Sequence, residues 1–229
     1  MSTNTGVKEV AIATILADVV INGLEVIDID LERERAMFKA RHSGVKFVPV
    51  KEVKTDRKVT RSVLDNVKVV IPVKVNGMVC LAGYYESGQV HVLRPDGVTM
   101  KFNTVGKCTS EGISTWETEK VTRCRYYPAS CNNQISYERA MLLLYGIMLD
   151  VLPENIDEYE VNSMDYSGSI KERGDKKIEF NFNLQNLEWC EDFENQLHRT
   201  LWEALFKWTG KCNSMSIYPL KNALVNIYK

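Results

Sequence analysis

The stretch that most constrains the fold is residues 67–102, VKVVIPVKVNGMVCLAGYYESGQVHVLRPDGVTMKF. Apolar residues recur at alternate positions along much of it, which is the period of a β-strand. Turn-forming residues interrupt the pattern at Asn76–Gly77, Glu86–Gly88 and Arg94–Gly97. The sequence therefore predicts four consecutive antiparallel strands joined by tight turns.

Two further strand-like runs extend this pattern, KFVPV at 46–50 and KVTRCRYY at 120–127. With them, about five or six short antiparallel strands are expected between residues 45 and 127. A small barrel or a strongly bent sheet would cover so many strand edges. Pro72 has no backbone N–H, so it predicts that its strand is an edge strand or contains a bulge.

Segments with apolar residues at helical spacing lie before and after the strands in the sequence. These segments are 7–22, 31–42, 137–150 and 187–209. The second helix should follow a short strand. The third follows Ser136, a capping residue, and is apolar nearly all round, which predicts a buried core helix. Residues 177–185, KIEFNFNLQ, alternate like another strand.

These elements predict an α+β fold, with a small antiparallel β-meander or barrel packed against a helix-rich C-terminal half. The expected organisation is an N-terminal helical segment at 1–44, a β-rich domain at 45–127 and an α-rich region with a β-hairpin at 128–229. The last two are either separate domains or layers of one continuous domain. A chain of 229 residues can bury a core of either kind.

Apolar run length, the N-terminal sequence and the cysteine spacing limit the classes of protein to which this chain can belong. The longest apolar run, at 140–149, falls short of the roughly 20 residues that span a bilayer. The N-terminus lacks the features of a secretory signal, so a soluble cytoplasmic protein without a membrane partner is expected. The six cysteines lack the paired spacing of a zinc site and are expected to be reduced thiols. No cofactor or metal is expected.

Catalytic motifs are also missing from the sequence. It contains no G-x-S-x-G nucleophile motif and no glycine-rich phosphate-binding loop. The three histidines form no catalytic pattern with the cysteines or serines. The sequence therefore favours a protein that is not an enzyme, and no catalytic residue is predicted.

One pattern nevertheless indicates a nuclease. Asp28 or Asp30, followed by Glu52 and Lys54 as an E-x-K, resembles the spacing of the PD-(D/E)-x-K nuclease superfamily. The resemblance covers about 27 residues. It implies that two carboxylates hold Mg²⁺ while the lysine polarises the attacking water or the phosphate.

A basic segment at 39–61 indicates nucleic acid instead. It holds eight Lys or Arg residues against two acids. A basic strand that ends in two tyrosines follows at 120–127, and charge beside aromatic rings suits single-stranded nucleic acid. The predicted nucleic-acid-binding residues are Lys51, Lys54, Arg57, Lys58, Arg61, Lys120, Arg123, Arg125 and Tyr127. A solvated face or a protein-docking patch is the alternative interpretation.

An acidic segment at 150–165 carries six acids and no base. We expect an exposed connector there, or a contact for the basic segment of another copy of the chain.

The last predicted helix supplies the leading functional hypothesis. Leu197, Leu201 and Trp208 should face its own core, while Trp202 and Phe206 fall roughly opposite and need another cover, either the C-terminal tail at 213–229 or a partner chain. We therefore predict a non-enzymatic intracellular interaction or assembly protein, a homo-oligomer or a component of a larger complex, with Trp202 and Phe206 binding the partner. A single-stranded nucleic-acid-binding protein and a metal-dependent nuclease are the alternatives.

Overall fold

The fold is described from a computed structural model, which describes residues 24–103, 108–118, 121–129, 132–165, 180–209 and 216–219. The predicted helix at 7–22 lies outside these ranges. In chain order the described elements are β1 (Glu25–Val26), α2 (Leu31–Arg41), β2 (Phe47–Val48), the 3₁₀ helix η1 (Val50–Glu52), α3 (Lys58–Asn66), β3 (Val67–Val75), β4 (Met78–Tyr85), β5 (Val90–Leu93), β6 (Thr99–Phe102), β7 (Cys108–Gly112), β8 (Thr115–Thr118), β9 (Val121–Tyr126), β10 (Ile135–Ser136), α4 (Tyr137–Leu149), β11 (Leu152–Pro153), the 3₁₀ helix η2 (Ile156–Glu158), β12 (Tyr159–Ser163), β13 (Leu187–Glu191) and α5 (Asp192–Thr209).

The α+β prediction is confirmed, and so is the meander. β3, β4, β5 and β6 are consecutive antiparallel neighbours, with turns at the three predicted positions. Asn76 and Gly77 both adopt positive φ angles, 49° and 81°, which the two-residue turn between β3 and β4 requires. β1 and β7 complete an open sheet of six strands in the order β1-β3-β4-β5-β6-β7.

The strand predicted at 120–127 forms, as β9, but it leaves this sheet. It pairs with β8 and β10 in a separate three-stranded sheet, and β2 pairs with β11 rather than with the meander. The strand that contains Pro72 is not an edge strand, because β1 pairs with it at Val73 and Lys74. Beyond β1 the Ile27 N–H donates to the Pro72 carbonyl at 3.0 Å while Pro72 has no N–H to donate in return, and the bulge of β3 lies between Val67 and Val69.

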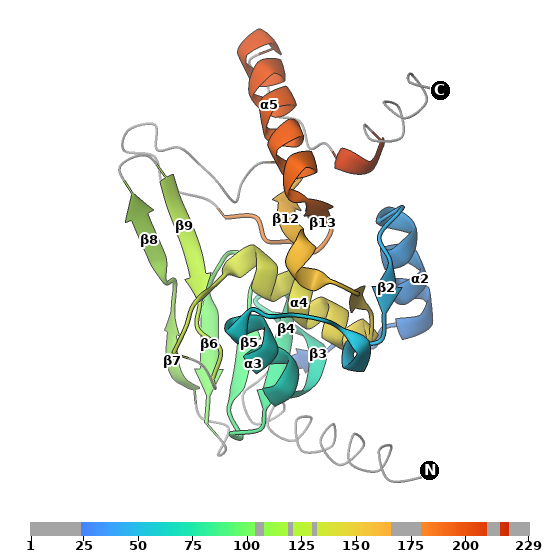
Figure 1. Cartoon of the computed structure of the whole chain (residues 1–229). Coiled ribbons are helices and arrows are strands. Elements are labelled where there is room, and N and C mark those ends of the chain that lie inside the picture. The colour runs from blue at the N-terminus through green and yellow to red at the C-terminus, as the bar shows by residue number, and fades with distance from the viewer. Residues whose placement is uncertain are drawn as a thin grey trace.

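α4 lies at the centre of the molecule, between the meander and the C-terminal strands (Figure 1). As predicted, it is buried nearly all round, including every residue from Arg139 to Gly146. The Ser136 hydroxyl does not cap it. Gly146 lets the chain return closely, because a Cβ there would lie 2.2 Å from the Leu152 side chain. The larger core cluster contains residues from Phe38 to Trp189, so the β-rich and α-rich segments share one hydrophobic core.

The C-terminal half differs most from expectation. Residues 180–183 form no strand, and the helix predicted from 187 begins at Asp192, because Leu187–Glu191 pair with β12 as β13. All but the last residue of β13 is buried. From this hairpin α5 extends away from the rest of the molecule (Figure 1).

The sequence prediction also missed α3, a nine-residue helix that begins near the end of the basic segment and continues to Asn66. Apolar and polar side chains are well separated around this helix, but it has only nine residues and the strand pattern of β3 follows it directly from Val67. The helix at 31–42 was predicted correctly and begins after Asp30, whose side chain accepts a hydrogen bond from the Arg33 backbone N–H at 3.0 Å. No helix among the described residues is long and apolar enough to cross a bilayer.

Candidate functional site

The basic segment contacts the acidic segment of the same chain. Glu154 forms ion pairs with Lys46 at 2.5 Å and with Lys54 at 2.9 Å. Backbone hydrogen bonds join the two segments as well, from Lys54 N to Glu154 O at 2.7 Å and from Glu154 N to Lys46 O at 3.0 Å. The ion pairs hold the pKa of Glu154 at about 2, chiefly through its hydrogen bonds to the two lysines. The predicted partner of the basic segment is therefore intramolecular at these positions.

Asp157 anchors the start of α3. Its carboxylate accepts hydrogen bonds from the Thr55 hydroxyl at 2.8 Å, the Asp56 N–H at 2.7 Å and the Arg57 N–H at 3.3 Å. Burial alone would raise the pKa of Asp157, but these hydrogen bonds outweigh it and leave the pKa lowered. Asp157 thus serves α3 as a capping group, since the helix's own first residues supply none.

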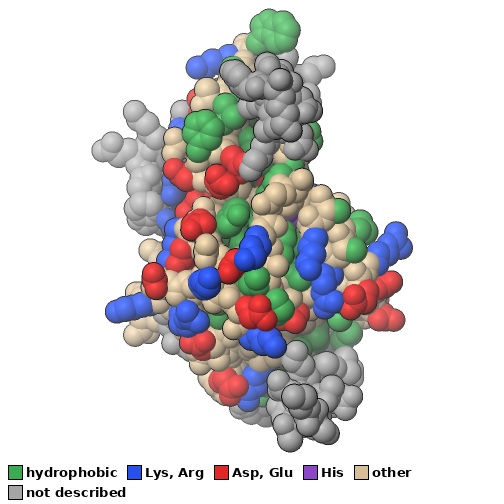
Figure 2. Space-filling model, turned by 45° about the vertical axis from the view of Figure 1, so that its right-hand side comes forward, with side chains coloured by type: hydrophobic (Ala, Val, Ile, Leu, Met, Phe, Trp, Pro, Cys, Tyr) green, Lys and Arg blue, Asp and Glu red, His purple; other side chains and the backbone are tan. Residues whose placement is uncertain are grey.

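Two arginines complete this charge network. Arg57 lies 3.6 Å from Asp157 and 3.2 Å from Glu160. The buried Arg139 of α4 donates to the carbonyls of Tyr159 at 2.6 Å and Ile156 at 2.8 Å. Figure 2 shows the consequence on one face of the molecule, where basic and acidic side chains are interspersed. Lys51 and Lys58 are exposed and form no ion pair with the part of the chain that the structure describes.

β9 presents the second group of predicted nucleic-acid-binding residues. Cys124 and Tyr126 are buried, whereas Arg123 and Tyr127 are exposed and Arg125 is partly exposed. The alternation expected from the sequence is therefore present. Lys120 lies outside the described residues. Arg61 of the basic segment donates to the Thr55 carbonyl at 3.0 Å.

The residues of the nuclease pattern serve other purposes. Asp30 caps α2, and Lys54 pairs with Glu154. Within the described ranges, no group of three or more His, Cys, Asp or Glu residues is arranged to hold a metal ion.

All three histidines, His42, His91 and His198, are buried. His91 contacts the Tyr126 hydroxyl through Nδ1 at 2.8 Å, and His42 contacts the Phe38 carbonyl through Nδ1 at 2.7 Å. Burial is the main cause that lowers the pKa of His42 to about 4 and that of His91 to about 3. Both are therefore neutral packing groups at neutral pH.

α5 exposes large apolar side chains. Phe193 is 73% exposed, Leu205 44% and Trp208 85%. From Arg199 to Trp208 no described side chain is buried. Figure 2 shows hydrophobic side chains at the end of the molecule that α5 forms. The expectation that the Trp208 face packs into the chain's own core is wrong, because the helix leaves the core after its first turns.

Four apolar residues of α5 follow a coiled-coil spacing. Leu197, Leu201, Ala204 and Trp208 are four, three and four residues apart, which is the alternation of a and d positions. The two leucines are partly exposed and the other two residues are exposed. Trp202 is also partly exposed, and the Phe206 side chain lies outside the description. A partner surface at Trp202 and Phe206 stays a prediction.

A pocket that sequence reasoning missed lies between the meander, α4 and the segment before β13. It encloses about 780 Å³. Ile27, Ile29, Pro72, Leu81 and Met141 are among the residues that form its apolar floor. No periodic pattern could have indicated it, because its walls come from segments far apart in the sequence.

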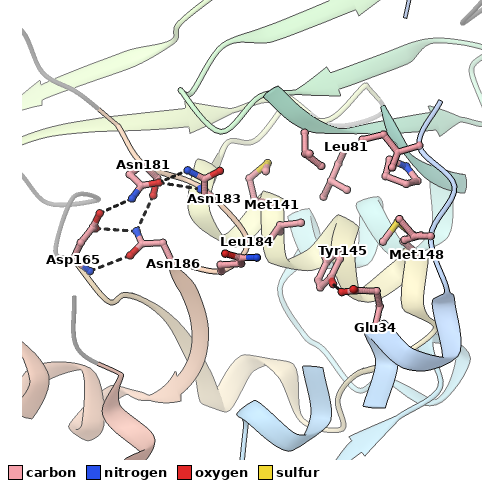
Figure 3. Close-up of a pocket in the computed structure, with 15 residues that line it drawn as sticks. Glu34, Leu81, Met141, Tyr145, Met148, Asp165, Asn181, Asn183, Leu184 and Asn186 are labelled. Carbon is pink, nitrogen blue, oxygen red and sulfur yellow. Dashed lines mark hydrogen bonds between the residues drawn. The ribbon is translucent and has the colours of Figure 1, made fainter. Parts of the chain in front are cut away.

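Two polar groups lie at opposite ends of this pocket (Figure 3). At one end Asn186 donates to Asp165 at 2.8 Å, and Asn181 donates to the same carboxylate at 2.5 Å. At the other end the Tyr145 hydroxyl donates to Glu34 at 2.7 Å. The arrangement can hold a molecule that is apolar along its length and polar at an end.

Because comparisons with known proteins found no match, the function has to be inferred from these residues. No family model matches the chain, and neither the curated proteins nor the solved structures hold a match to it.

Proposed function

We propose that this chain is a non-enzymatic interaction or assembly protein that self-associates through α5. The observation that carries the proposal is the 85% exposure of Trp208 on a helix in which no described side chain from Arg199 onward is buried. Burying one tryptophan removes on the order of 200 Å² from water, worth about 5 kcal/mol before the costs of association. Large apolar side chains so exposed usually mark an interface.

A second copy of the same helix fits this surface. In a two-fold dimer both subunits use the same patch, so the patch must be self-complementary. An a/d-spaced apolar stripe meets this condition when two helices pair along it. An antiparallel pair would place the Phe193 end of each helix against the Trp208 end of its partner. The formal net charge of −1 offers no strong repulsion between copies.

The test is the molar mass of the full chain, measured by light scattering across micromolar concentrations. We expect a dimer for the natural chain and a monomer for Trp208→Glu, with Leu205→Glu in the same direction. Met37→Glu is the matched control, because Met37 is an exposed apolar residue on α2, 55% exposed. Truncating a central aromatic anchor typically weakens association by about thirtyfold or more. A natural chain that stays monomeric throughout, or a control as disruptive as Trp208→Glu, contradicts the proposal.

Single-stranded nucleic acid is the second candidate, and the alternating burial of β9 favours it. Arg123 and Tyr127 offer a charge and a ring on one exposed side of the strand. Binding of a labelled oligonucleotide should then weaken steeply with added salt and fall in Arg123→Glu. Lys54→Gln should matter less, because Glu154 already neutralises Lys54. Absence of binding at low salt removes this candidate. The cytoplasmic location stays a prediction.

A further inference from the structure

We propose that the pocket between α4, β4 and the segment before β13 binds a small organic cation with an elongated apolar body. This site is separate from α5 and does not depend on self-association. Its volume of about 780 Å³ lies within the range of ligand pockets in proteins.

The polar lining is acidic. Of the fifteen lining residues that the structure describes, Glu34 and Asp165 carry carboxylates and none is Lys or Arg. A ligand with a carboxylate or a phosphate would meet two like charges there. A ligand with an ammonium group would meet opposite charge at the Glu34 end, at low cost in desolvation because the pocket has an open, polar rim at Asn183 and Gln185.

The Glu34 end offers a carboxylate beside an aromatic ring, and Arg41 also lies near enough to attract this carboxylate. Glu34 accepts one hydrogen bond, from Tyr145 to its Oε2. Burial raises the pKa of Tyr145, so its hydroxyl stays protonated and remains the donor. No ion pair joins Glu34 to another described residue. The Tyr145 ring is fixed by an edge contact with Phe38, with the ring centroids 5.4 Å apart. A carboxylate beside a fixed aromatic ring favours an ammonium group by charge and by cation–π attraction.

The floor of the pocket selects the body of the ligand. Met141 and Leu81 are buried there, and Met148 and Leu184 are partly exposed (Figure 3). Methionine side chains adapt to irregular shapes, so the floor suits a flexible alkyl chain as well as a ring. Met141 and Leu184 lie between the Tyr145–Glu34 pair and Asp165 (Figure 3), which favours an elongated molecule over a compact one.

Titration calorimetry with simple amines tests the proposal on the full chain. The probes are butylammonium, hexylammonium and octylammonium, with hexanol and hexanoate as neutral and anionic counterparts. We expect the amine affinity to rise about fourfold for each added methylene group until the floor is covered. Hexylammonium should bind at least tenfold more tightly than hexanol, and hexanoate should bind more weakly than either.

Two variants locate the binding. Glu34→Gln keeps an acceptor for Tyr145 and should lower the hexylammonium affinity about tenfold while leaving hexanol unchanged. Glu32→Gln, on the same helix but 84% exposed and paired with Arg35, is the control and should bind like the natural chain. Val79→Trp places a large ring on the exposed side of the pocket, where Val79 is 54% exposed, and should weaken all the probes. Circular dichroism checks that each variant is folded.

Three outcomes overturn the proposal. No saturable binding of octylammonium means that the pocket takes no such ligand. An amine affinity that does not change with the length of the alkyl chain means that the amines only pair with surface carboxylates. Equal losses in Glu34→Gln and Glu32→Gln mean that the binding lies elsewhere. Trp208→Glu should bind hexylammonium normally, so this proposal and the proposed self-association fail separately.

Discussion

Asp157→Ala removes the carboxylate that joins the acidic segment to the start of α3. The variant loses three hydrogen bonds, from the Thr55 hydroxyl and from the backbone N–H groups of Asp56 and Arg57. It also loses an ion pair with Arg57 at 3.6 Å. The change leaves a small cavity at the surface, so the effect comes from the polar contacts.

The magnitude follows from the exposure of each partner. Loss of a helix capping group costs about 0.5–2 kcal/mol. Thr55 is buried, at 8% exposure, so the loss of the acceptor for its hydroxyl hydrogen should add about 1–2 kcal/mol. The Arg57 side chain is 41% exposed, and such ion pairs contribute about 0–1 kcal/mol. We therefore expect Asp157→Ala to lower the free energy of unfolding by roughly 1.5–5 kcal/mol.

Urea unfolding followed by tryptophan fluorescence measures this loss. Glu154→Ala is the control and should lower the free energy of unfolding clearly less, because the two lysines that pair with Glu154 are mostly exposed. The loss should also depend on pH. The folded pKa of Asp157 lies below its ordinary value of 3.8, so its stabilisation is complete above that pH and is lost as the pH falls through the folded pKa. Equal losses in the two variants, or a gap between Asp157→Ala and the natural chain that widens in acid, refute this account.

Three further outcomes are expected. Gly146→Ala should destabilise by about 2 kcal/mol or more in thermal unfolding, although alanine normally favours helices, because its Cβ would lie 2.2 Å from the Leu152 side chain. Because burial lowers the pKa of His42 and His91 below the ordinary 6.5, unfolding takes up protons and stability falls as the pH falls from 6.5 toward 4, by about 2 kcal/mol per histidine at pH 5. Urea titrations at two pH values measure this change, and a free energy of unfolding that does not change with pH contradicts it. Arg139→Met should lower the free energy of unfolding by about 3–5 kcal/mol in the same assay, because two backbone carbonyls and the nearby acidic side chains lose their buried cationic partner. A loss below about 1 kcal/mol would be too small for this role.

The sequence by itself determined the local elements whose signals are short-range. The meander at 67–102 was predictable because strand period and turn residues agree within a few positions, and Asn76–Gly77 requires backbone angles that few other pairs adopt. α4 was predictable for a similar reason, since a run that is apolar on every side can only be buried. The alternation of β9 follows from the same two-residue period.

Only the tertiary structure decided which charged side chains pair with one another and which faces of the helices and strands are buried. The basic segment looked available for a ligand, yet Glu154 and Asp157, about a hundred residues further along, use part of its charge. Residues 187–191 continue the helical pattern of α5, but pairing with β12 makes them a strand, because cross-strand bonds outweigh local preference. The outward direction of α5 follows from that pairing, since the hairpin fixes where the helix begins. The pocket likewise has no local signal, because Glu34, Leu81 and Asp165 meet only when the chain is folded.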